Sequence, residues 1–151
     1  MLNIMRALSS AQTVTALLAP LGRAYRRHVD KAFLSLGVSH TLALPVMLLG
    51  RLEDGVRQGA LVDALGVEAP SLVPLLNQLE RSGLVERRAD IADKRAKTLH
   101  LTPSGRDLAA RAEIVANDVR SAILSAIPAD EIEVAARVLN RLQLALDEAD
   151  G

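Results

Sequence analysis

Residues 79–105 read LERSGLVERRADIADKRAKTLHLTPSG and predict two short strands between two helices. Leu84–Arg88 begins with apolar, strand-forming residues. Lys97–Leu101 alternates polar and apolar side chains with the period of two that is typical of a half-buried strand. The polar segment 89–94 joins the two runs. The sequence therefore predicts a β-hairpin with a charged loop.

The residues on either side of this hairpin mark helix boundaries. Ser82-Gly83 closes the preceding helix. Thr102 predicts an N-cap, and Pro103 suits the first position of the next helix because an N–H there would have no helical partner. We expect that helix to run to about Ile127 and a last helix to begin at Pro128.

A helix-turn-helix is predicted immediately before the hairpin. Ala60–Leu65 is a short helix that Gly66 ends. Leucines then follow at i, i+3, i+4 and i+7, the spacing of one buried helical stripe. These leucines are Leu72, Leu75, Leu76 and Leu79. The outward face of this second helix is expected to contain Ser71, Val73, Pro74, Asn77, Gln78 and Arg81.

Two further helices are predicted upstream. The first covers about residues 21–36 and ends at Gly37, a residue type that commonly stops a helix. The second covers Thr41–Leu52 with Ser39 as its N-cap, and it is apolar nearly all round, so we expect it to be central. Pro45 is expected to kink this helix or to delay its start.

The predicted fold class is mainly α with a small β-hairpin wing, a winged helix-turn-helix with long helices before and after it. This plan suits duplex DNA, because the major groove admits one helix whose outward side chains reach base edges. A neighbouring hairpin can place cations on phosphates or in the minor groove. Between Glu86 and Lys97 the hairpin holds five cations against three acids, and the cations are Arg87, Arg88, Lys94, Arg95 and Lys97.

Charge is unevenly distributed along the chain, although 18 basic and 18 acidic residues balance. Residues 1–56 carry 6 basic and 3 acidic groups, residues 57–106 carry 8 and 6, and residues 107–151 carry 4 and 9. A neutral total thus permits the basic face that phosphate binding needs. Tyr25 and Phe33 are the only aromatic residues, which favours duplex DNA over single strands or RNA, whose bases stack on aromatic rings.

Composition also excludes several functions. The chain has no cysteine, which excludes disulfides, thiolate metal sites and cysteine nucleophiles. The first 20 residues predict neither a signal peptide nor a membrane span, so we expect a cytoplasmic protein. No Gly-rich phosphate loop, carboxylate pair or nucleophile–base set is visible. We therefore expect no enzyme activity, no cofactor and no metal.

The chain resembles the MarR family of bacterial regulators, and within it the SlyA-like branch. The resemblance rests on residues 79–87 (LERSGLVER), 93–97 (DKRAK) and 99–105 (LHLTPSG). Residues 66–73 (GVEAPSLV) are also similar to that branch. The matching motifs cover about Gly66–Gly105, and the helices on either side match by order and length.

The resemblance implies a single domain over residues 1–151 that forms a homodimer through helices at about 21–36 and 107–149. A DNA-binding lobe would cover about residues 38–106. The resemblance further implies a sequence-specific transcriptional regulator, usually a repressor, on a pseudo-palindromic operator. Many members release DNA when a small phenolic or carboxylic ligand enters a crevice beside the DNA-binding lobe. His28 and His40 are candidates for binding such a ligand, and ordinary surface or packing histidines are the alternative.

The resemblance also implies roles for single residues. Arg95 would be the wing-tip arginine that enters the minor groove, and Asp93 would orient it through a charge-assisted hydrogen bond. Ser71 would meet DNA at the start of the recognition helix. The chain departs from the family at Pro74, because the family often has arginine or another polar residue there. An internal proline removes a helix hydrogen bond, so we predict either a late helix start, with Ser71 as N-cap, or a kinked first turn.

Several alternatives stay open. The charged hairpin could be a solvated loop, and Asp93 and Arg95 could form a surface ion pair worth about 0–1 kcal/mol. Pro74 and the neutral net charge would also suit a winged-helix protein-interaction module that has lost specific DNA reading. Under the main interpretation, the expected DNA-binding residues are Ser71, Asn77, Gln78, Arg87, Arg88, Asp93, Lys94, Arg95 and Lys97.

Overall fold

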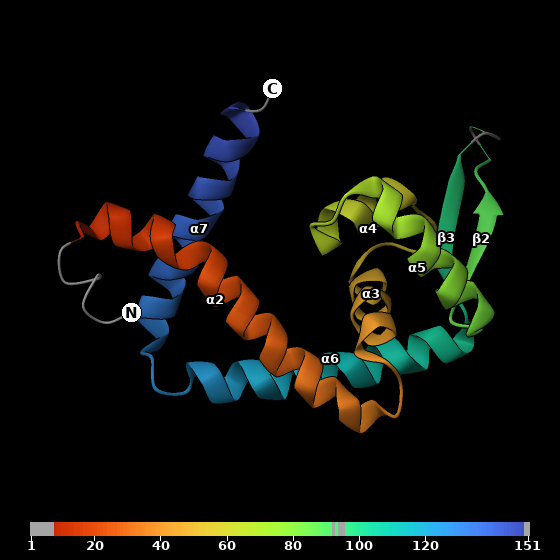
Figure 1. The fold of residues 1–151 in the computed structure, drawn as a ribbon, viewed down its shortest axis with the longest axis horizontal. Helices are drawn as coiled ribbons and strands as arrows, with labels where there is room; N and C mark the ends of the chain where they lie inside the picture. The colour runs from red at the N-terminus through yellow and green to blue at the C-terminus, as the bar shows by residue number, and fades with distance from the viewer. Residues whose placement is uncertain (1–7, 92, 94–95, 150–151) are drawn as a thin grey trace. The chain divides into compact units, whose positions relative to one another are not determined.

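A computed structural model describes residues 8–91, 93 and 96–149 (Figure 1). The described chain is mostly helical and contains one small antiparallel sheet of three strands. It divides into two compact units, residues 1–117 and 118–151, and the boundary falls within helix α6. The predicted fold class is confirmed in its helical content, its hairpin and the order of its elements.

Helix α2, Ser10–Phe33, begins well before the predicted start at residue 21. The reason is a capping box: the backbone N–H of Gln12 donates to Ser9 Oγ (3.2 Å), and the backbone N–H of Ser9 donates to Gln12 Oε1 (2.9 Å). Such reciprocal bonds satisfy two N–H groups that a helix start leaves unpaired. After one turn of 3-10 helix, Leu34–Leu36, the chain ends this segment at Gly37, whose φ of 69° is left-handed, as predicted.

Helix α3, His40–Arg51, is the predicted central helix. Ser39 caps it as expected, because its Oγ accepts from the backbone N–H of Thr41 (3.4 Å). The helix passes through Pro45, so this proline does not delay its start. Most of its apolar side chains are buried, and Val46 is fully so, which confirms the central position.

A two-residue strand and two helices follow. Strand β1, Val56–Arg57, was not predicted. Helix α4, Gln58–Leu65, ends at Gly66 (φ 63°), and α5, Ala69–Arg81, begins after a three-residue turn. The chain direction changes by 108° between the two helices, within the range of about 90–120° that is usual for a helix-turn-helix.

The predicted late start of α5 is wrong. The helix begins at Ala69, and the backbone N–H of Ser71 already donates to the carbonyl of Glu68 (3.0 Å). Pro70, in the first two helical positions, favours this early start because its ring fixes φ near the helical value. Pro74 therefore lies inside the helix, where it cannot donate to the carbonyl four residues earlier.

The hairpin is confirmed. Strand β2, Val85–Ala89, pairs with β3, Lys97–Leu101, and β3 also pairs with β1, so the strand order is β1-β3-β2. The register places Arg87 opposite Leu99 and Ala89 opposite Lys97. In Figure 1 the hairpin lies beside α5, and α5 contacts β2.

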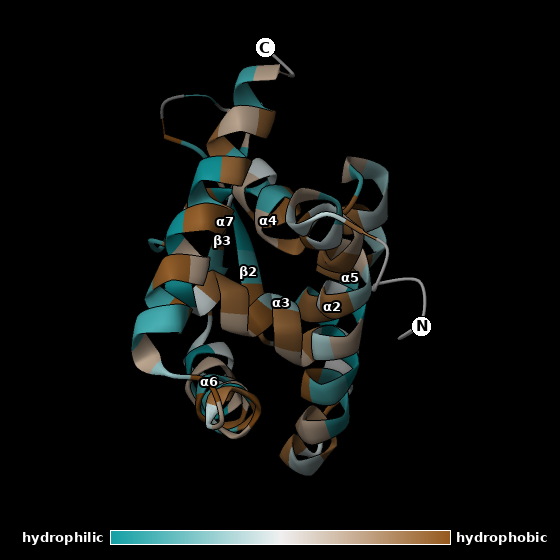
Figure 2. Ribbon diagram, turned by 90° about the vertical axis from the view of Figure 1, so that its left-hand side faces the viewer, coloured by the Kyte–Doolittle hydropathy of each residue, from teal (hydrophilic) through white to brown (hydrophobic). Residues whose placement is uncertain are grey.

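Two long helices complete the chain. Helix α6, Pro103–Leu124, starts as predicted, because Thr102 Oγ1 accepts from the backbone N–H of Gly105 (3.0 Å). Helix α7, Ala129–Ala149, has no buried residue, and Figure 2 shows hydrophobic and hydrophilic residues intermixed along it. No single helix of the described chain is long and apolar enough to cross a membrane, although α2 with α3, and α4 with α5, reach that length and hydropathy as bent pairs.

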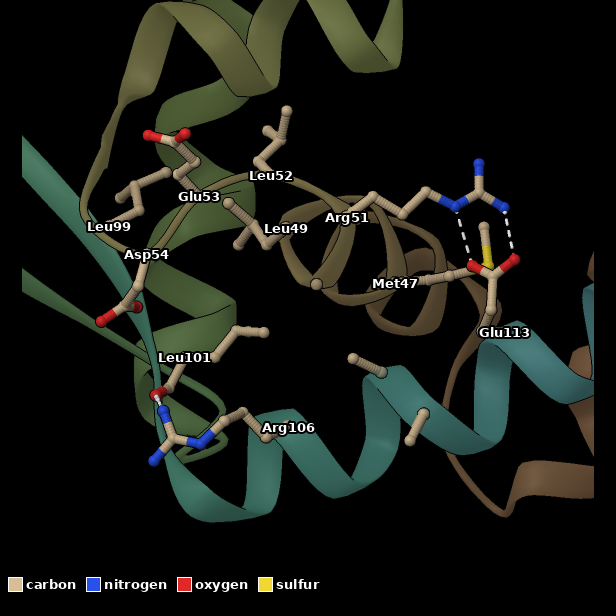
Figure 3. Close-up of a pocket in the computed structure, with 13 residues that line it drawn as sticks. Met47, Leu49, Arg51, Leu52, Glu53, Asp54, Leu99, Leu101, Arg106 and Glu113 are labelled. Carbon is tan, nitrogen blue, oxygen red and sulfur yellow. Dashed lines mark hydrogen bonds and ion pairs between the residues drawn. The ribbon is translucent and has the colours of Figure 1, made fainter.

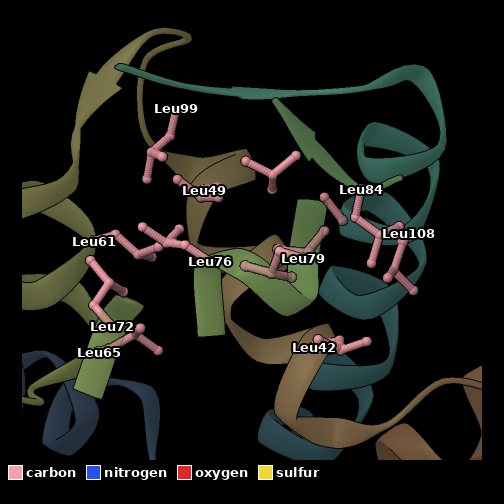
Figure 4. Close-up of a cluster of buried hydrophobic side chains, with 13 residues drawn as sticks. Leu42, Leu49, Leu61, Leu65, Leu72, Leu76, Leu79, Leu84, Leu99 and Leu108 are labelled. Atoms are coloured by element: carbon pink, nitrogen blue, oxygen red, sulfur yellow. The ribbon is translucent and has the colours of Figure 1, made fainter. Parts of the chain in front are cut away.

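One leucine-rich core holds the helix-turn-helix, the sheet and the start of α6 together (Figure 4). The predicted stripe of α5 is buried at Leu72, Leu76 and Leu79, and Leu75 is half-buried. Leu99 of β3 and Leu108 of α6 join it. This shared core fixes the hairpin against α5, so the outward faces of both elements are presented by one rigid lobe.

Candidate nucleic-acid interface

The outward face of α5 is polar and open. Ser71, Gln78 and Arg81 are exposed, and within the described chain none of their side chains has a hydrogen-bond or ion-pair partner. Val73 and Pro74 lie exposed between them. Because the opposite face is buried in the core, these side chains project from the lobe as those of a groove-reading helix must.

Asn77 and Arg87, both predicted to bind DNA, are joined by a hydrogen bond. Arg87 Nη2 donates to Asn77 Oδ1 (2.8 Å) and also to the Glu80 carboxylate. The side chain of Arg87 is only 22% exposed. The hydrogen bond from Arg87 lowers the pKa of Glu80 below its ordinary value. Arg87 therefore ties strand β2 to the recognition helix.

The remaining cations of the hairpin differ in their ion pairing and exposure. Arg88 pairs with Glu86 two residues away (3.0 Å), and both side chains are more than half exposed, so this pair is weak and open to competition from a phosphate. Lys97 is exposed at the start of β3. Lys94 and Arg95, predicted for the tip of the wing, lie outside the described residues, as does the predicted contact between Asp93 and Arg95.

The base of the wing is held by contacts that the sequence analysis missed. Arg57 of β1 pairs with Asp90 (2.9 Å), whose side chain is only 14% exposed. The N–H of Asp90 donates to the carbonyl of Ala96 (3.1 Å), and the N–H of Ala96 donates to the carbonyl of Asp93 (2.9 Å). A two-residue strand leaves almost no periodic signal, so neither β1 nor the role of Arg57 could be found from pattern.

His100 of β3 connects two parts of the lobe. Its Nδ1 lies 3.2 Å from Asp54 Oδ2 and its Nε2 lies 3.0 Å from Thr98 Oγ1. The hydrogen bond with His100 lowers the pKa of Asp54. These contacts connect β3 to the loop after α3. His100 therefore helps to hold the hairpin in place.

A cavity of about 270 Å³ lies between α2, α3 and the helix-turn-helix. Arg26 and Asp30 line it from α2, and Ser71 and Leu75 line it from α5. Arg26 has no ion-pair partner within the described chain. His28 lines neither this cavity nor the one described in the next paragraph, and its Nδ1 is 2.9 Å from the carbonyl of Ala24 on its own helix. The side chain of His40 lies outside the described part of the structure.

A larger cavity of about 540 Å³ lies between the end of α3, strand β3 and the start of α6 (Figure 3). Leucines and alanines form much of its wall, and both of its arginines are engaged by protein acceptors. Arg51 donates to both carboxylate oxygens of Glu113 (2.7 and 2.9 Å), and Arg106 Nη1 donates to the carbonyl of Leu101 (2.6 Å). This cavity is therefore less suited to binding an anion than the cavity at Arg26.

A helix-turn-helix joined to a basic, well-supported hairpin defines the winged-helix class of DNA-binding proteins. Residues 46–96 match the model of the MarR family. A solved transcriptional regulator, PA3341, is 37% identical over 89% of this chain and 98% of its own, with a TM-score of 0.82. This chain belongs to the MarR family of DNA-binding transcriptional regulators, as its motifs predicted, and that family is a class of regulators rather than of enzymes.

Two more distant structures share the fold. CouR from Rhodococcus jostii RHA1, solved with p-coumaroyl-CoA, is 24% identical over 90% of this chain and 95% of its own, with a TM-score of 0.76. MepR from S. aureus, solved with DNA, is 22% identical over 87% of this chain and 96% of its own, with a TM-score of 0.73.

Proposed function

We propose that this chain is a ligand-responsive transcriptional repressor of the SlyA-like branch that binds a pseudo-palindromic operator as a homodimer. The observation that supports DNA reading most strongly is the open polar face of α5 beside the basic hairpin. Ser71 and Gln78 are free to contact bases, while Arg88 and Lys97, with Lys94 and Arg95 at the wing tip, would contact phosphates and the minor groove. Such a regulator would act in the cytoplasm, where the chromosome lies.

The homodimer is supported by apolar side chains that the single chain leaves exposed. Leu21 of α2 is 59% exposed, and Leu139 and Leu146 of α7 are 50% and 59% exposed. Exposed leucines on long helices are suited to an association surface when they form a continuous patch. We propose that residues 1–151 form one domain in which helices at about 21–36 and 107–149 dimerise and the lobe at about 38–106 reads DNA.

The proposed effector is a small aromatic carboxylate bound in the cavity at Arg26. A free guanidinium beside the apolar walls supplied by Leu44, Pro45 and Leu75 suits an anionic group attached to an apolar body. Ser71 lines the same cavity, so a ligand there would contact the start of the recognition helix. CouR, which shares the fold, holds p-coumaroyl-CoA, an aromatic thioester.

The effector proposal is tested by thermal shift with benzoate and cinnamate derivatives. Binding should raise the melting temperature of the native protein and release it from operator DNA, because the ligand favours one arrangement of the lobe. The variant Arg26→Gln should lose this shift. Arg27→Gln, one residue on and outside the cavity, is the matched control and should keep it. An equal response from both variants would overturn the assignment of the cavity.

The DNA proposal is tested by selection from random duplexes. A dimeric repressor should enrich an inverted repeat, and adding the protein should lower transcription in vitro from a promoter that overlaps the repeat. A protein-interaction module, favoured by the neutral net charge, would enrich no sequence. The absence of an enriched repeat would therefore overturn the proposal in favour of that module.

A further inference from the structure

The contact between Arg87 and Asn77 bears on which bases the recognition helix can read. Asn77 is half-buried on the side of α5 that faces β2, and Arg87 reaches it from that strand. We infer that Arg87 makes Asn77 act mainly as a hydrogen-bond donor toward DNA and thereby disfavours adenine as the base that Asn77 contacts. This inference rests on the proposed DNA-binding function and names a specificity determinant within it.

The chemistry of the two groups fixes the orientation of the amide. A guanidinium has only donors, so the Asn77 atom that faces Arg87 must be the carbonyl oxygen. The amide nitrogen, which carries two N–H donors, then points away from Arg87. The oxygen is held by a charge-assisted hydrogen bond of 2.8 Å, stronger than a bond between neutral groups.

Glu80 holds Arg87 in this position. It lies three residues after Asn77, on the same side of α5, and its carboxylate accepts from the same Nη2 of Arg87. Arg87 itself is fixed in the sheet opposite the buried Leu99. Arg87 is therefore a positioning residue, held by a carboxylate and by the sheet.

An asparagine whose oxygen is engaged by an arginine prefers different bases from a free one. Asparagine recognises adenine through two bonds, with its oxygen accepting from N6 and its nitrogen donating to N7. The bond from Arg87 occupies one of the two acceptor sites of that oxygen and fixes the direction of the amide, so the oxygen is less available for that pairing. The remaining N–H groups match acceptors, which the major groove displays as O6 and N7 of guanine, as O4 of thymine and as N7 of adenine. Adenine also presents its N6 donor beside N7, and a second donor cannot pair with that group.

The test is selection from random duplexes with four proteins: the native chain, Asn77→Ala, Arg87→Met and Arg87→Lys. The position that Asn77→Ala changes identifies the base pair that Asn77 reads. The native chain should prefer guanine or thymine over adenine there, by roughly three- to tenfold, the value of one hydrogen bond. Arg87→Met should remove that discrimination against adenine, and Arg87→Lys, which can still donate to the oxygen, should retain it.

Matched measurements separate specificity from folding and from general affinity. Arg88→Met, on the neighbouring exposed residue, should weaken binding to all sequences alike. Melting curves show which variants are folded. If Arg87→Met does not fold, the test depends on Arg87→Lys, which should preserve the native base preference. Unchanged discrimination in folded Arg87→Met, altered preference in Arg87→Lys, or no effect of Asn77→Ala would overturn the inference. No enriched sequence with the native chain would overturn the proposed function as well.

Discussion

Arg87 connects the wing to Asn77 and Glu80 of the recognition helix, and it makes the stability of the fold depend on pH. Its hydrogen bond lowers the pKa of Glu80 in the folded chain. A carboxyl whose folded pKa is depressed stabilises the fold above its unfolded pKa. That contribution is lost as the pH falls through the depressed value.

We therefore predict that acid destabilises the native chain more than Arg87→Met. Urea unfolding between pH 7 and pH 3 measures this difference, which should be no more than about 1 kcal/mol because the pair is partly exposed. Arg88→Met, which breaks an exposed pair with Glu86, is the control and should follow the native curve. Parallel curves for the native chain and Arg87→Met would contradict the assignment.

Pro74 is a second residue whose position lowers the stability of the fold. It lies on the exposed face of α5, inside the helix rather than in its first turn. Replacing it with alanine restores an N–H that can donate to the carbonyl of Pro70. We predict that Pro74→Ala raises the free energy of unfolding by about 1–3 kcal/mol. Pro70→Ala, in the first turn where no such bond is lost, should change it little. A Pro74→Ala variant no more stable than Pro70→Ala would contradict this account.

At the scale of elements, the turn between α5 and β2 is clamped by the start of α6. Thr102 Oγ1 donates to the carbonyl of Gly83 (2.6 Å), and the N–H of Thr102 donates to the carbonyl of Leu84 (3.1 Å). Gly105 leaves room for that same carbonyl, because a Cβ there would lie 2.0 Å from the Leu84 oxygen. Hydrogen bonds thus explain the threonine at position 102, and close packing explains the glycine at position 105.

This clamp predicts opposite effects for two glycine substitutions. Gly105→Ala should destabilise the fold by about 1–3 kcal/mol or more, because backbone must move to admit the methyl group. Gly59→Ala, in α4 with nothing within 4 Å of the added carbon, should be neutral or stabilising by up to about 1 kcal/mol. Thermal or urea unfolding of both variants measures the contrast, and equal effects would show that the clamp is absent.

Elements with a periodic pattern were predictable, and boundaries set by single contacts were less so. The leucine stripe of α5 and the alternation of β3 each reflect one buried face, so the sequence alone indicates them. The start of α2 depends on two reciprocal hydrogen bonds between Ser9 and Gln12, and the start of α5 depends on Pro70 outweighing Pro74. The link between Arg87, Asn77 and Glu80 joins two elements and has no pattern along the chain.

At the scale of the whole molecule, the exposed apolar side chains of α2 and α7 support the proposed homodimer. We predict that the native chain sediments as a dimer and that Leu139→Asp weakens self-association at least tenfold, because a charge would enter an apolar interface. Asn140→Asp adds the same charge one residue further along α7 and is the control. Light scattering that finds a monomer for the native chain, or equal masses for both variants, would contradict the dimer.

We propose that the wing and α5 together bind duplex DNA, and fluorescence anisotropy across a salt series tests this most directly. The native chain should bind its selected repeat with an affinity that falls linearly in log–log form as salt rises, because phosphate contacts release counterions. Arg95→Ala should bind more weakly and with a shallower slope, while Arg111→Ala, on α6 and paired with Asp107, should match the native chain. Equal affinity and equal slope for Arg95→Ala and the native chain would contradict the account.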